Sequence, residues 1–515
     1  MNVPFPLQFA RRLPKWFRRY VLNLVENPVH GQAAFMDAAE LKQHFSAKHK
    51  TGLWLSDQYR LSQRESNANI ITLGVTGSGK SQGLGYRNVL NMTGSAIITD
   101  LSGEYYQHTS GYLAKQGANI QVLNFTDLAQ SSRFNPLLRL KNHQEKYFAA
   151  QSIAQRLHSA NDPLWTDRAS ELLFLVIHAL GEYSQRPGCQ AYNTLGNVLW
   201  VISNLLSHPN DVSRFFDDAL AHDPFSFARY QSILSQDEKI LSSIVTTAEA
   251  SLSLFTDPDV RTLTASDNIC LDPQIMREKK TITYLIVPEN LTGYYGLLIN
   301  LFYSAFFNEV FRTDLANIEG HPITLMMDEF PAMGKINNFA MTATTIRKYN
   351  ICLHMLFQSW SQLEAVYGKV DAESILEGGV GTKIFLPGHW LKTAKWLEES
   401  LGYTTVYDSK YGGVAQHTVR EPLLSADQIR MLDNEQTIIL TGNKKPMTLK
   451  IPHAYKTALQ TLLAMPPALL PTSDIDPPEQ LIPLKALATV NDPGTFSVAP
   501  NTVGYAPQPP YATNV

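Results

Sequence analysis

The chain has 515 residues, of which 44% are hydrophobic and 17% are charged, and its formal net charge is −3. This length is sufficient for two or three domains, and the composition is that of a globular protein rather than a disordered one. The slight negative charge excludes nucleic-acid binding through overall basicity, so a nucleic-acid partner would need a local basic surface. Three cysteines without metal-ligand spacing predict buried thiols in a reducing compartment: Cys189, Cys270 and Cys352.

Residues 1–27 combine basic side chains with aromatic and aliphatic ones, and Glu26 is the first acidic residue of the chain. Pro14 suits the first turn of a helix, so the pattern favours a basic amphipathic helix. Two interpretations stay open: the helix lies on an anionic membrane surface, or it packs on the protein or on a partner. The uncharged stretch Leu291–Asn308 directly follows an expected strand, which predicts a buried helix rather than a membrane span. Without a signal peptide, we expect a cytoplasmic protein.

A short apolar run, Ile70–Leu73, is followed at once by the spacing G-x-x-x-x-G-K-S. This is the phosphate-binding P-loop pattern, in which glycines allow successive backbone N–H groups to point at phosphate oxygens. A helix starting near Lys80 would add its positive dipole end, Lys80 would reach the β- and γ-phosphates, and Ser81 would ligate Mg²⁺. The alternative is a glycine-rich surface turn. The predicted nucleotide-binding residues are Gly74, Val75, Thr76, Gly77, Ser78, Gly79, Lys80 and Ser81.

Apolar runs that alternate with helical stretches predict a mainly parallel sheet with helices on both faces. Early strands are expected at Gly52–Leu55, Ala96–Asp100 and Ile120–Phe125. From residue 142 to residue 268 helical periodicity recurs without a convincing strand, which predicts an all-α domain inserted into the sheet domain. Later strands are expected at Thr281–Val287, Ile323–Asp328, Ile351–Phe357, Thr382–Leu386, Thr437–Thr441 and Met447–Ile451.

Two acidic residues, Asp328 and Glu329, follow the apolar run Ile323–Met327. An acid at the carboxyl end of a buried strand faces the P-loop in sheet folds that bind nucleotides. Asp328 would hold Mg²⁺, and Glu329 would orient and polarise the water that attacks the γ-phosphate. An Asp-Glu pair alone is better explained by an ordinary strand end, but its combination with an upstream P-loop favours the catalytic interpretation.

Gln358 and Arg347 are two further predicted catalytic residues. Gln358 follows the strand Ile351–Phe357, where an amide could sense the γ-phosphate or position water. Arg347 ends the preceding helix and could stabilise charge in the transition state, within its own subunit or in that of a neighbour. From the residues alone, a polar strand cap and an exposed helix-end arginine are equally good interpretations.

Prolines cluster beyond Ala464, and proline interrupts both helix and sheet. We therefore expect a disordered or extended tail, which serves either as a partner-binding strip or only as a solubilising segment. The predicted organisation is a basic amphipathic segment and lead-in (1–50), a nucleotide-binding domain in two parts (51–141 and 269–464), the inserted all-α domain (142–268) and a proline-rich tail (465–515).

Eight short segments resemble, in order and spacing, the conjugative coupling proteins of type IV secretion, the TraG/TraD-like family of DNA-translocating ATPases. The segments are His30–Phe35, Gly74–Ser81, Asp100–Glu104, Phe134–Leu137, Trp165–Ala169, Asp328–Phe330, Gln358–Leu363 and Arg420–Leu424. In the family, a glutamine and an arginine occupy the places of Gln358 and Arg347, and a helical domain is inserted after the third strand. The family's usual N-terminal transmembrane helices are not predicted here, and the proline-rich tail is not a family feature.

The resemblance implies an α/β fold of the RecA-like P-loop NTPase type that hydrolyses ATP with Mg²⁺. It implies a homo-hexameric ring that moves DNA, with Arg347 supplied from the neighbouring subunit. The implied partners are DNA, relaxase or relaxosome proteins and the secretion channel, at the cytoplasmic face of the bacterial inner membrane. Two other functions stay open: a receptor for protein effectors that uses ATP for substrate hand-over, and an ATPase that uses the nucleotide only for ring assembly.

Overall fold

The computed structural model describes residues 31–45, 47–155, 163–315, 318–407, 418–470 and 479–484. The basic segment predicted at 1–27 lies outside these residues. Within the described ranges, no helix combines the length and the apolar character that a membrane span requires.

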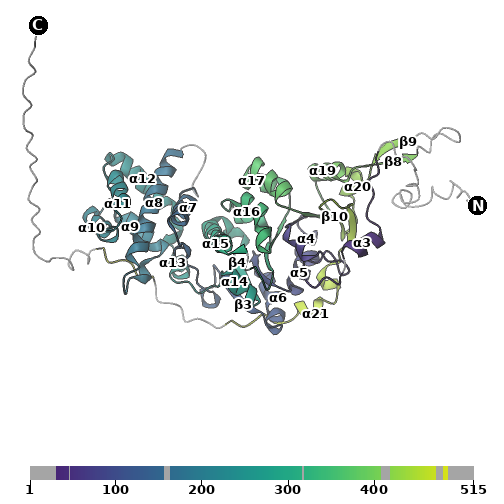
Figure 1. Cartoon of the computed structure of the whole chain (residues 1–515), viewed down its shortest axis with the longest axis horizontal. Helices are drawn as coiled ribbons and strands as arrows, with labels where there is room; N and C mark the ends of the chain where they lie inside the picture. The colour runs from purple at the N-terminus through teal and green to yellow at the C-terminus, as the bar shows by residue number, and fades with distance from the viewer. Residues whose placement is uncertain are drawn as a thin grey trace, which may run out of the picture.

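One nine-stranded sheet forms the centre of the molecule (Figure 1). Its strand order is β11-β10-β7-β1-β6-β5-β2-β4-β3. The strands from β7 to β3 pair in parallel, whereas β10 and β11 extend one edge of the sheet in antiparallel fashion. In register, Ile71 of β1 lies between Met355 of β6 and Lys383 of β7. The strands are β1 (Ile70–Leu73), β2 (Ser95–Asp100), β3 (Asn119–Asn124), β4 (Thr281–Ile286), β5 (Ile323–Met327), β6 (Ile351–Phe357), β7 (Thr382–Phe385), β10 (Gln436–Thr441) and β11 (Met447–Lys450).

The predicted RecA-like α/β class with a mainly parallel sheet is confirmed. Every residue of β1, β2, β4, β5 and β6 is buried, which explains why these strands read as continuous apolar runs in the sequence.

The strand predicted at Gly52–Leu55 is wrong, because Trp54 forms only an isolated bridge with Arg60. The Leu53 N–H donates to Ser66 Oγ at 2.9 Å, and the Trp54 N–H donates to Asn88 Oδ1 at 2.7 Å. Side chains therefore bind these two N–H groups in place of a neighbouring strand. The Leu55 N–H donates to the Tyr59 carbonyl and the Leu53 carbonyl accepts from the Leu61 N–H, both at 2.9 Å, so the other backbone contacts stay within the local turn.

A separate antiparallel hairpin, β8 (Tyr403–Tyr407) and β9 (Thr418–Pro422), was not predicted from the sequence. Three of the five β9 residues are exposed, so the sequence of β9 lacks the apolar residues that would mark a buried strand.

The helices outside the inserted domain are α3 (Ala38–His44), α4 (Gln63–Asn67), α5 (Tyr86–Leu90), α6 (Glu104–Lys115), α14 (Pro273–Glu278), α15 (Thr292–Arg312), α16 (Phe339–Thr345), α17 (Trp360–Tyr367), α18 (Lys369–Glu373), α19 (Leu391–Leu401), α20 (Ala426–Arg430) and α21 (Gln460–Leu463).

The predicted all-α domain lies between β3 and β4 in the chain and forms one end of the molecule (Figure 1). The described residues between 142 and 268 contain helices and no strand. In helix α8, the run Leu172–Ile177 is at most 1% exposed, as expected for a helix with neighbours on all sides. The helices are α7 (His143–Gln155), α8 (Pro163–Tyr183), α9 (Leu195–Asn204), α10 (Pro209–Ala219), α11 (Pro224–Leu234), α12 (Glu238–Ser251) and α13 (Pro258–Thr264).

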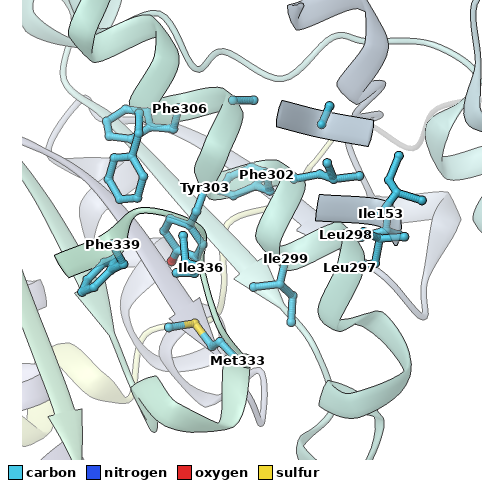
Figure 2. Close-up of a cluster of buried hydrophobic side chains, with 14 of the residues drawn as sticks. Ile153, Leu297, Leu298, Ile299, Phe302, Tyr303, Phe306, Met333, Ile336 and Phe339 are labelled. Atoms are coloured by element: carbon cyan, nitrogen blue, oxygen red, sulfur yellow. The ribbon is translucent and has the colours of Figure 1, made fainter. Parts of the chain in front are cut away.

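Helix α15 joins the all-α domain to the sheet domain through a shared apolar core. Figure 2 shows its side chains meeting Ile153 of α7 on one side and Ile336 and Phe339 on the other. Phe302 and Phe306 of α15 are fully buried in this core. The stretch Leu291–Asn308 is thus a buried helix of the α/β core, as predicted.

Parts of the proline-rich tail make defined contacts. The Tyr106 hydroxyl donates to the Ala468 carbonyl at 2.7 Å, and Asn197 Nδ2 donates to the Gln480 carbonyl at 2.9 Å. Ile482 and Leu484 are 1% and 4% exposed. Residues 479–484 therefore agree with the extended alternative of the tail prediction and not with the disordered one, while residues 471–478 and 485–515 lie outside the described residues.

Candidate nucleotide-binding site

The P-loop connects β1 to the helix η1 (Lys80–Gly85), which continues directly into α5. Gly77 and Gly79 have φ angles of 78° and 96°, in the left-handed region that favours glycine. The loop turns back on itself, and Lys80 Nζ donates to the Gly74 carbonyl at 3.0 Å. The predicted nucleotide-binding residues Gly74–Ser81 thus form one loop between the carboxyl end of β1 and a helix N-terminus.

The Asp328 carboxylate lies beside the P-loop serine. Strand β5 is two positions from β1 in the sheet, with β6 between them, and parallel strands end at the same edge. The Ser81 hydroxyl donates to Asp328 Oδ2 at 3.3 Å. The two residues predicted to hold Mg²⁺ are therefore in direct contact.

Glu329 meets two of the other predicted catalytic residues. Its Oε1 lies 3.0 Å from Lys80 Nζ, and Gln358 Nε2 donates to its Oε2 at 3.4 Å. The Glu329 backbone has φ 46° and ψ 49°, a left-handed conformation that costs a non-glycine residue about 1–3 kcal/mol. Such strain at a polar residue is typical of functional sites.

Arg347 does not join this cluster within the chain. It lies in the short helix η9 (Ile346–Tyr349), just before the amino end of β6, and its side chain is exposed. Gln358 follows the carboxyl end of this seven-residue strand. At 3.3 Å per residue, the strand places the two backbones roughly 20 Å apart, farther than an arginine side chain can span.

The charges around Asp328 are closely spaced. Burial, together with the neighbouring Glu329 charge, raises the pKa of Asp328 to about 6, and Lys80 acts in the opposite direction. The Tyr105 side chain is buried, and its hydroxyl adjoins Ser81 and Asp328.

These residues fit a Mg²⁺ ion, which prefers oxygen ligands and is usually bound through one or two carboxylates together with substrate phosphates. The site offers a carboxylate in contact with a serine hydroxyl. No cluster of three or more histidine, cysteine, aspartate or glutamate residues with metal-binding geometry occurs in the described ranges.

Tyr105 and His453 are two neighbours of the site that the sequence does not single out. Asp100 accepts a hydrogen bond from the Tyr106 N–H at 2.8 Å, which fixes the start of α6 and so places Tyr105. A Cβ at Gly79 would meet the imidazole of His453. The motif Asp100–Glu104 points to Tyr105 by proximity, whereas His453 follows β11 with no motif around it.

Residues 31–475 match the family described as type IV secretory system conjugative DNA transfer. The chain belongs to this family. The conjugative DNA-transfer match contains the whole nucleotide-site cluster and the all-α domain, and it confirms the TraG/TraD-like resemblance.

Two curated proteins show the extent of the similarity within the conjugative DNA-transfer family. Protein VirD4 of Agrobacterium fabrum (strain C58 / ATCC 33970) is 24% identical over 395 residues, which cover 73% of this chain and 57% of VirD4. Conjugal transfer protein TraG of Escherichia coli is 24% identical over 403 residues, which cover 70% of this chain and 61% of TraG. The chain thus spans somewhat more than half the length of these relatives.

Solved structures of the coupling protein TrwB have the same fold as this member of the conjugative DNA-transfer family. The unbound TrwBdeltaN70 structure has a TM-score of 0.65 at 18% identity, covering 81% of this chain and 92% of TrwB. TrwB in complex with ADP and Mg²⁺ has a TM-score of 0.64 at 17% identity, covering 82% and 94%.

Proposed function

We propose that this conjugative DNA-transfer protein binds ATP with Mg²⁺ at the P-loop and hydrolyses it. The observation that carries the proposal is the meeting of Lys80, Ser81, Asp328 and Glu329 at one edge of a parallel sheet. TrwB, which shares the fold, has been solved with ADP and Mg²⁺ and with a non-hydrolysable ATP analogue.

Each residue has a role that follows from its chemistry. The backbone of Gly74–Ser81 and the Lys80 ammonium would bind the phosphates. Ser81 and Asp328 would hold Mg²⁺, which when bound neutralises charge on the phosphate oxygens. The Glu329 carboxylate would accept the proton of the attacking water. Gln358, which donates to Glu329, would orient that carboxylate and the water.

The hydrolysis would drive DNA towards a secretion channel in a homo-hexameric ring. The conjugative DNA-transfer family and a relative named for conjugal transfer support this part of the proposal. In such a ring, Arg347 would complete the site of the neighbouring subunit, because it cannot reach the site of its own. Relaxase or relaxosome proteins and channel components would be partners, and residues 1–27 would contact the cytoplasmic face of the bacterial inner membrane.

The first prediction concerns the effect of DNA on ATP hydrolysis. We expect DNA to stimulate turnover several-fold, because a translocase couples each hydrolytic cycle to contacts with phosphates of the strand. Phosphate release should be measured with single-stranded DNA, with double-stranded DNA and without DNA, alongside the mass of the assembly.

The matched control for this assay is Lys80→Ala, which should show no turnover under any of these conditions. If the hydrolysis rate depends on Lys80 but does not change when DNA is added, the effector-receptor or ring-assembly function is favoured. Turnover that persists in Lys80→Ala would contradict the assignment of the site itself.

A further inference from the structure

Residues 479–484 of the tail lie on the all-α domain, far along the molecule from helix α21, which precedes them in the chain (Figure 1). Residues 466–470 lie along α6, where Ala468 exchanges hydrogen bonds with Tyr106 and Ser110. After eight further residues, Glu479–Leu484 contact helix α9 and neighbouring side chains. The tail is thus fixed to both domains of the chain.

One asparagine of α9 forms two hydrogen bonds with the backbone of residues 479–484. Asn197 Oδ1 accepts from the Ile482 N–H at 2.8 Å, and Asn197 Nδ2 donates to the Gln480 carbonyl at 2.9 Å. One turn later, Trp200 Nε1 donates to the Ile482 carbonyl at 3.2 Å. Proteins that bind extended peptides commonly form such hydrogen bonds with the peptide main chain. These bonds do not depend on the side chains of the peptide.

The contacts of the Glu479 carboxylate at the start of α9 would favour a peptide with an acidic residue at this position. The side chain is 2% exposed; it accepts a hydrogen bond from the Thr194 hydroxyl and lies 3.6 Å from Arg261 of α13. Thr194 caps α9, so the carboxylate also meets the positive end of the helix dipole. A Cβ at Gly196 would collide with this carboxylate, so the glycine leaves the space that Glu479 occupies.

Two apolar side chains complete the docked segment. Ile482 and Leu484 are 1% and 4% exposed and belong to the main apolar core, whereas the intervening Leu481 is 45% exposed. The buried positions therefore follow the pattern Glu-x-x-Ile-x-Leu. Residues 479–484 form no helix or strand, so their binding depends on these contacts alone.

We propose that this α9 surface, formed by Thr194, Gly196, Asn197, Trp200 and Arg261, is a binding site for extended Glu-x-x-Ile-x-Leu peptides. The chain's own residues 479–484 occupy the α9 surface as a tethered ligand. The proposal is independent of ATP hydrolysis, because none of these residues belongs to the nucleotide site.

The test uses a fluorescent peptide with the sequence of residues 477–486 and the full-length chain. The variant Glu479→Ala/Ile482→Ala loses the main contacts of residues 479–484, so this segment should leave the α9 surface. The peptide should then bind to the vacated surface saturably. The wild-type chain should bind it at least about tenfold more weakly, because the tethered segment competes at a high effective concentration. Fluorescence anisotropy measures both affinities.

Peptide variants provide matched controls. Replacing the glutamate or the isoleucine of the peptide by alanine should weaken binding at least about tenfold, whereas Leu481→Ala should leave it unchanged because this side chain is exposed. Adding Asn197→Ala to the vacated chain should abolish binding. Absence of saturable binding, or equal binding of all three peptide variants, would overturn the proposal.

A second measurement does not depend on the vacated variant. Excess peptide added to the wild-type chain should accelerate hydrogen exchange at the Ile482 amide, which loses its bond to Asn197 when the tail is displaced. Unchanged exchange at saturating peptide would equally overturn the proposal. The thermal midpoint, measured in the same samples, reports whether each variant is folded.

Discussion

At Asp328, burial favours a neutral carboxyl group, whereas the proposed binding of Mg²⁺ requires a charged one. Its pKa is raised from 3.8 to about 6, chiefly by burial and then by Glu329. An acid with a higher pKa in the folded state stabilises the fold fully below its unfolded pKa, and this stabilisation is lost as the pH rises through the folded value. At pH 7 the charged carboxylate therefore reduces the free energy of unfolding, by at most about 3 kcal/mol.

We predict that Asp328→Asn raises the thermal midpoint at pH 7.5 and weakens Mg²⁺-dependent ATP binding. The gain in midpoint should shrink as the pH falls from 7.5 to 4, because protonated aspartate and asparagine are both neutral. Calorimetry across this pH range without nucleotide measures the difference. The exposed Asp433→Asn should show no such trend, and a lower midpoint of Asp328→Asn at pH 7.5 would contradict the argument.

At the scale of elements, Asn69 fixes strand β1 and hence the P-loop that follows it. Asn69 is fully buried in a left-handed conformation with φ 62°. Its Nδ2 donates to the carbonyls of Ala343 and Gly379 at 2.7 Å, and its Oδ1 accepts from the Leu353 N–H at 2.9 Å. One side chain thus connects β1 to β6 and to the segment that precedes β7.

We predict that Asn69→Ala destabilises the protein by at least about 3 kcal/mol, because three buried backbone groups lose their partner. Asn69→Gly should recover about 1 kcal/mol of this loss, since glycine adopts the left-handed conformation without strain. Thermal unfolding of the two variants separates hydrogen bonding from backbone strain. The half-buried Asn67→Ala is the control and should cost less than either. An Asn69→Ala midpoint equal to that of the wild type would contradict this role.

Several elements could be predicted from sequence because burial alone determines them. The strands β1, β2, β4, β5 and β6 are buried along their whole length and appear as apolar runs. The P-loop and the Asp328–Glu329 pair follow two of these runs, so their meeting at one sheet edge could be expected.

Other features depend on contacts that hydrophobic periodicity in the sequence does not predict. The Gly52–Leu55 run is apolar, but the N–H groups of Leu53 and Trp54 donate to the side chains of Ser66 and Asn88. The hairpin β8–β9 is largely exposed on β9 and has no apolar alternation. The docking of Glu479–Leu484 depends on one asparagine and two apolar side chains within a proline-rich segment, which composition alone cannot reveal.

For the whole molecule, the position of Arg347 bears on assembly. The residue lies at the amino end of β6, while the phosphate-binding loop lies at the carboxyl end of β1, which runs parallel to β6. An arginine at this position can act on a nucleotide only if another subunit presents it to the site.

We predict that Arg347→Ala and Lys80→Ala are each inactive but complement one another when co-expressed. A mixed ring contains interfaces at which an intact P-loop meets an intact Arg347, so part of the ATP turnover should return. The turnover of affinity-purified mixed assemblies measures this effect, with the neighbouring Lys348→Ala as a control that should remain active alone. Mixed assemblies without activity would show that Arg347 does not act between subunits.

Glu329 is proposed to activate water at a site where ATP is already held. The most direct measurement is single-turnover ATP hydrolysis by Glu329→Gln, with ATP affinity measured on the same sample. Hydrolysis should fall at least about 100-fold, the usual contribution of a general base, while affinity changes only a few-fold. The exposed Glu373→Gln should match the wild type. Hydrolysis by Glu329→Gln at a rate near that of the wild type would contradict the account.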